Sequence, residues 1–138
     1  MIDFFSENDF QLRHEEGLKD WISSVISSEG FEEGDVSFVF CNDVYLLNIN
    51  LEFLNHDTLT DIISFDYSMD KQLHGEVYIS TERVVENSKE FGVSFTNELH
   101  RVIIHGVLHL CGYKDKLEAD RELMRNREDT SLDIRGFI

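Results

Sequence analysis

The chain contains no proline and only two cysteines among its 138 residues. Without proline there is no polyproline or collagen-like segment, and two cysteines are too few for the disulfide framework of a small secreted domain. No apolar run approaches the roughly 18 residues of a membrane span. The N-terminus lacks the basic start and long apolar core of a signal peptide. These absences favour a cytoplasmic protein without a membrane segment.

Basic residues are scarce in the first half of the chain. Residues 1–70 hold two Lys or Arg and 16 Asp or Glu, whereas residues 71–138 hold ten and 12. The formal net charge of −16 excludes tight, salt-driven binding of nucleic acid by the isolated chain, because such binding requires a basic surface. Since residues 101–138 are electrically balanced, weak binding of RNA is still expected there. A basic protein is the natural partner for the acidic half.

The composition, 41% hydrophobic and 29% charged, is that of a globular protein, and the length predicts one domain over residues 1–138. Hydrophobic periodicity and turn signals predict helices at about 9–29, 42–53, 80–91, 96–111 and 116–128. Alternating patterns predict strands at 36–41, 61–66 and 75–80. The mixture predicts an α+β fold, with a small mixed β-sheet covered by helices.

The helix near residues 102–111 is apolar almost all round, which predicts that it is buried. Yet it carries His105 and His109, whose i,i+4 spacing puts both imidazoles on one face and suits two nitrogens on one zinc ion. Gly112 can adopt a positive φ and turn the chain sharply. Asp115 then follows as a third ligand, against the alternative of an ordinary loop carboxylate. These residues predict a site for one zinc ion.

Three protein ligands leave one position open for water, as in catalytic zinc sites. A zinc peptidase of the HExxH kind has glutamate after the first histidine, but here Gly106 follows His105. A metal-dependent phosphodiester hydrolase is therefore favoured. Two alternatives stay open: a zinc peptidase with another base, and a non-catalytic factor with a structural zinc ion held by a fourth protein ligand. Cys111 should point away from the site, and the ungrouped histidines should be surface or structural residues: His14, His56, His74 and His100.

These motifs resemble the YbeY family of bacterial rRNA maturation factors. Residues 105–115 match the family's His-Gly-x-Leu-His-Leu-x-Gly-Tyr-Asp-His signature, residues 60–65 match Thr-Asp-Val-Leu-Ser-Phe, and residues 75–77 match Gly-Asp-Ile. The resemblance implies a zincin-like fold with the metal on a central buried helix. It also implies a zinc-dependent, single-strand-specific endoribonuclease in 16S rRNA 3′-end maturation and ribosome quality control. A small-subunit ribosomal protein and an assembly GTPase are the implied partners.

Two positions depart from the family pattern. Asp115 stands where the family usually has its third histidine, and a carboxylate is a harder, anionic ligand. Leu54 stands where the family often has an arginine, so the phosphate contact must come from another base near the motif. Asp61 is expected either to accept a hydrogen bond from a ligand histidine or to cap a turn. The strand at 75–80 is expected either at the sheet edge beside the metal or in the core.

Overall fold

The computed structural model describes residues 1–56 and 58–138, and four strands and five helices lie within them. The strands are β1 (Ile2–Ser6), β2 (Glu32–Cys41), β3 (Ile62–Asp66) and β4 (Gln72–Ser80). The helices are α1 (Glu15–Ser28), α2 (Asp43–Leu54), α3 (Thr81–Phe91), α4 (Phe95–Leu110) and α5 (Glu118–Asp133). This architecture confirms the predicted α+β class. Within the described residues, no helix has both the length and the apolar character needed to cross a membrane.

The strands form one mixed sheet in the order β1-β2-β4-β3. Strands β1, β2 and β4 run parallel, and β3 pairs antiparallel with β4. The predicted strand at 75–80 is therefore an interior strand, and β3 forms the edge of the sheet on that side. Of the two alternatives for residues 75–80, the core strand is confirmed and the edge strand is wrong, because β4 has partners on both sides.

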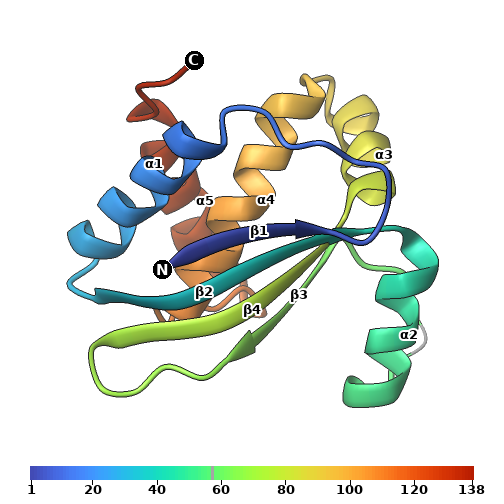
Figure 1. The fold of residues 1–138 in the computed structure, drawn as a ribbon, viewed down its shortest axis with the longest axis horizontal. Helices are drawn as coiled ribbons and strands as arrows, with labels where there is room; N and C mark the ends of the chain where they lie inside the picture. The colour runs from blue at the N-terminus through green and yellow to red at the C-terminus, as the bar shows by residue number, and fades with distance from the viewer. Residues whose placement is uncertain (57) are drawn as a thin grey trace.

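Helix α4 is buried against one face of the sheet, as its apolar sequence predicts. Figure 1 shows α1, α4 and α5 on one side of the sheet, whereas α2 lies apart from them, at the end of the sheet where β2 and β4 finish. The close approach of α4 is possible because Gly106 has no side chain. A Cβ at this position would lie 2.9 Å from Val77 Cγ1 and 3.1 Å from Ile62 Cδ1. This contact fixes the helix against the strands that flank the predicted site.

Several element boundaries differ from the prediction. Helix α1 begins at Glu15 rather than near residue 9, because His14 adopts a left-handed conformation with φ 61°. The preceding Phe10 and Leu12 still pack against the core without being helical. Helix α5 continues to Asp133, well past residue 128. Strand β1 was not predicted; its five residues become a strand by pairing with β2, about 34 positions later in the chain.

Candidate active site

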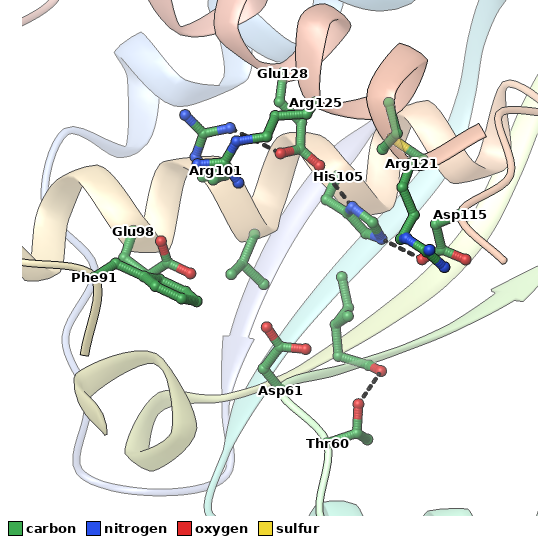
Figure 2. Close-up of a pocket in the computed structure, with 13 residues that line it drawn as sticks. Thr60, Asp61, Phe91, Glu98, Arg101, His105, Asp115, Arg121, Arg125 and Glu128 are labelled. Atoms are coloured by element: carbon green, nitrogen blue, oxygen red, sulfur yellow. Dashed lines mark hydrogen bonds and ion pairs between the residues drawn. The ribbon is translucent and has the colours of Figure 1, made fainter. Parts of the chain in front are cut away.

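A cleft of about 500 Å³ lies beside α4, between α5 and the start of β3. Figure 2 shows the polar side chains of these elements facing one another across it. The lining residues are Thr60, Asp61, Ile62, Phe91, Glu98, Arg101, Val102, His105, Asp115, Arg121, Met124, Arg125 and Glu128. The predicted ligands His105 and Asp115 are among them, so the structure gathers distant parts of the chain around the predicted site.

The imidazole of His105 is held by Glu128, which lies 23 residues later on α5. Nδ1 of His105 lies 2.7 Å from Oε2 of Glu128, and Arg101 donates to the other oxygen of this buried carboxylate at 2.9 Å. An ionised carboxylate can only accept, so Nδ1 carries a proton, and in the neutral imidazole Nε2 is left with a lone pair. Ligand histidines in metalloproteins are oriented in the same way.

Of the two roles expected for Asp61, accepting a hydrogen bond from a ligand histidine is filled by Glu128 instead. Oδ2 of Asp61 accepts from Asn87 Nδ2 at 3.3 Å. Burial raises the pKa of Asp61, although the charge of His105 opposes the shift. Burial also raises the pKa of Glu98, which is further raised by the charge of Asp61. The cleft thus contains two carboxyl groups whose environment favours holding a proton.

Asp115 lies beside Nε2 of His105, the ring nitrogen that Glu128 does not contact. Their closest atoms, His105 Nε2 and Asp115 Oδ2, are 3.2 Å apart. Two ligands of a tetrahedral zinc ion, with bonds of about 2.0–2.1 Å, are separated by about 3.3 Å. The spacing of this pair therefore fits joint coordination of one ion. Gly112, with φ +104°, makes the turn that returns Asp115 to the helix.

His109 lies one helical turn beyond His105, and the two rings are nearly parallel at 5° with centroids 6.5 Å apart. Its Nδ1 lies 3.1 Å from the carbonyl oxygen of Tyr113. A carbonyl only accepts, so Nδ1–H donates and Nε2 keeps its lone pair. His109 is exposed and is not among the lining residues of the cleft. Within residues 1–56 and 58–138, no three His, Cys, Asp or Glu side chains stand as a completed metal group.

The pKa of His105 reflects opposing influences. Burial lowers it, but the hydrogen bond and charge of Glu128 raise it, with further contributions from the charges of Asp115 and Asp61. The net shift is upward, so the site attracts positive charge to the imidazole. A proton and a metal cation are both favoured by the same carboxylates.

Of the four arginines between residues 101 and 127, three line the cleft and one does not. Arg101, Arg121 and Arg125 line the cleft, whereas Arg127 pairs with Glu29 at 3.1 Å, away from the cleft. Arg101 is committed to two carboxylates of α5. Arg121 and Arg125 are exposed, which leaves them accessible to an anion entering the cleft.

Cys111 is not among the residues that line the cleft. Burial raises the pKa of its thiol to about 12, with contributions from the charges of Glu29 and Asp66. Without a metal ion, its thiol is therefore protonated at neutral pH.

Comparisons with known proteins agree with the motif. The model of the family described as Endoribonuclease YbeY matches residues 3–135. An Endoribonuclease YbeY of Flavobacterium psychrophilum is 57% identical over 134 residues, covering 97% of this chain and 96% of that protein. Another, of Cytophaga hutchinsonii, is 42% identical over 138 residues, covering 99% and 96%. The solution structure of TM1509 from Thermotoga maritima superposes with a TM-score of 0.71 at 27% identity, covering 96% of this chain and 87% of that one.

The fold, the cleft and these matches define the class of protein as an endoribonuclease, a hydrolase that acts on RNA. The chain belongs to the Endoribonuclease YbeY family. Family membership confirms the resemblance inferred from residues 60–65, 75–77 and 105–115.

Proposed function

We propose that the chain, acting as one domain over residues 1–138, is a zinc-dependent endoribonuclease. Its substrate is single-stranded RNA, cleaved during maturation of the 16S rRNA 3′ end and in ribosome quality control. One observation carries the metal assignment: His105 and His109 both use Nδ1 for a hydrogen bond to an acceptor. This pairing presents both Nε2 atoms as ligands.

His105, His109 and Asp115 would hold one Zn²⁺ ion. A bound zinc ion would supply Lewis acidity and lower the pKa of a water molecule for attack on phosphorus. Glu128 fixes the ring of His105 through its 2.7 Å contact with Nδ1. Arg101 holds Glu128 in turn, so the orientation of the ligand depends on a chain of charge-assisted hydrogen bonds between α4 and α5.

The substrate's phosphates require basic partners, and Leu54 cannot supply one. Arg121 and Arg125 line the cleft from α5 and can donate to two phosphate oxygens. Phe91, at the end of α3, also lines the cleft and is 59% exposed. An exposed ring beside arginines suits stacking of an unpaired base, which supports single-stranded RNA as the substrate.

The proton released by the attacking water needs an acceptor. Asp61 lines the same cleft as His105, and burial raises the pKa of its carboxyl. A carboxylate with a raised pKa is a better base than an exposed one. We assign Asp61 Oδ1 or Oδ2 as the proton acceptor.

The peptidase alternative receives no support from the position after the first histidine. Gly106 packs against Val77 and Ile62, so a glutamate there would collide with the sheet rather than serve the site. The cytoplasm as location, and a small-subunit ribosomal protein and an assembly GTPase as partners, are proposed on the family resemblance.

The proposal is tested by incubating purified protein with a 16S rRNA 3′-precursor and mapping the products. Wild-type protein and the control His56→Ala, which changes an exposed histidine outside the cleft, should cleave it. His109→Ala should lower the rate by about 100-fold or more. Equal cleavage by wild type and His109→Ala would mean that a contaminating nuclease is responsible. Hydrolysis of a peptide library without RNA cleavage would replace the proposal with the peptidase.

A further inference from the structure

Helix α2 is apolar on most sides and yet lies at the surface. Only Leu46 and Asn50 are buried. Helices that are apolar all round are normally buried, and clustered exposed apolar side chains mark interaction surfaces. Large apolar side chains of α2 with 38–66% exposure are Val44, Tyr45, Leu51, Phe53 and Leu54. Figure 1 shows this helix standing away from α1, α4 and α5.

Between α2 and the strands β3 and β4 lies a second hollow of about 440 Å³, called here the aromatic groove. Its lining residues are Tyr45, Asn48, Ile49, Glu52, Phe53, Phe65, Tyr67, Glu76 and Tyr78. Phe65 has two edge-on neighbours, Phe53 at 5.8 Å and Tyr78 at 5.9 Å between ring centroids. Tyr45 stacks on Tyr78 at 6.5 Å. The rings thus form a connected aromatic wall.

The aromatic groove and the catalytic cleft use opposite faces of β3 and β4. Phe65 is paired with Glu76, and side chains of paired residues share a face. Alternation along each strand places Ile62 and Val77 on the other face, where both approach Gly106 of α4. The groove and the cleft share no lining residue. A ligand in the groove would therefore leave the cleft open.

The charged side chains that line the aromatic groove are all acidic. Its charged lining residues are Glu52 and Glu76, and Lys and Arg are absent from the described residues that line it. The hydroxyl of Tyr78 donates to Glu76 Oε2 at 2.8 Å, and the pKa of Tyr78 is raised by burial and by this carboxylate. In the sequence, residues 20–70 contain no Lys or Arg. The surroundings therefore favour a cation.

We propose that the aromatic groove binds an arginine side chain of a basic protein segment. Tyrosine and phenylalanine faces attract cations, and a planar guanidinium can stack on a ring while donating to a carboxylate such as Glu52 or Glu76. A lysine ammonium has no planar face to stack. RNA fits less well, because base stacking in nucleic-acid grooves is combined with basic residues that contact phosphates. This inference does not depend on the nuclease proposal.

The test is calorimetric titration with three peptides of equal length that alternate glycine with arginine, lysine or citrulline. The arginine peptide should bind more tightly than the lysine peptide, and the uncharged citrulline peptide should not bind. The double variant Glu52→Gln/Phe53→Ala should weaken arginine-peptide binding by about tenfold. Both positions are exposed, so folding should be retained.

The matched control is Glu16→Gln/Phe5→Ala. It removes the same net charge and one exposed ring, from α1 and from the distant strand β1, and should leave the affinity unchanged. Equal weakening in both double variants would attribute binding to net charge and overturn the proposal. Equal affinity for the lysine peptide would also overturn it. So would a single-stranded oligouridine that displaces the arginine peptide from the groove.

Discussion

Two of the three histidines of helix α4, His100 and His105, lie five residues apart in opposite surroundings. At its N-terminal half, His100 is 2% exposed and its Nδ1 lies 2.9 Å from the guanidinium of Arg135. At its C-terminal half, His105 faces the carboxylates of Glu128 and Asp115. An arginine can only donate and a carboxylate can only accept, so Nδ1 accepts in His100 and donates in His105.

The difference shows why two histidines on one buried helix have separate roles. Burial lowers the pKa of His100 to about 4, helped by the charges of Arg135 and His14. The carboxylates around His105 outweigh burial and raise its pKa. His100 is therefore a neutral core residue, as the sequence predicted for ungrouped histidines. His105 is held in an environment that favours a cation.

The largest expected difference between His100 and His105 lies in how their ionisation makes the free energy of unfolding depend on pH. The pKa of His100 is about 4 in the folded chain, against an ordinary value of 6.5, so the unfolded chain binds the proton more tightly. Its stabilising contribution is present above pH 6.5 and is lost as the pH falls towards 4. The shift corresponds to about 3 kcal/mol of unfolding free energy.

The measurement is denaturant unfolding of wild type and His100→Gln between pH 7 and pH 4. Glutamine can still accept from Arg135 but does not titrate. Wild type should lose about 3 kcal/mol more than the variant over this range. Parallel losses would show that His100 is not held in its neutral form, and the contrast with His105 would disappear.

A smaller effect, on zinc affinity, should follow from removing one negative charge beside His105. Glu128→Gln removes the charge beside Nδ1 while keeping the shape of the side chain. Zinc affinity should fall by about 10–100-fold, the usual effect of losing a residue that orients a ligand. Competition with a chromophoric chelator measures the affinity.

The control for Glu128→Gln is Asp129→Asn. Asp129 also accepts from Arg101, at 2.6 Å, but the hydrogen-bond partner of His105 Nδ1 is Glu128. Zinc affinity should stay at the wild-type value in this control. An equal fall in both variants would assign the effect to Arg101 and the α4–α5 contact rather than to orientation of the imidazole.

The sequence predicted what depends on short-range patterns. Apolar periodicity located α4, and the i,i+4 spacing identified His105 and His109 within it. Turn signals placed the start of α2 at Asn42 or Asp43, and the side chain of Asn42 accepts from the backbone of Tyr45 at 2.8 Å. These features follow from neighbours within one or two helical turns.

The features that sequence reasoning missed depend on long-range packing. Strand β1 exists through pairing with β2. Glu128 reaches His105 only because α5 packs on α4. The aromatic groove combines side chains of α2, β3 and β4. The net charge of the whole chain was the poorest guide to its binding surfaces. Exposed arginines line the cleft, whereas carboxylates line the aromatic groove on the other face of the sheet.

The central claim is that His105 and His109 hold a metal ion together with Asp115. Its most direct test is zinc content by mass spectrometry after loading and dialysis. Wild type and the control His56→Ala should retain one zinc ion per chain, whereas His105→Ala and His109→Ala should retain none. Full zinc occupancy in both of these variants would contradict the account.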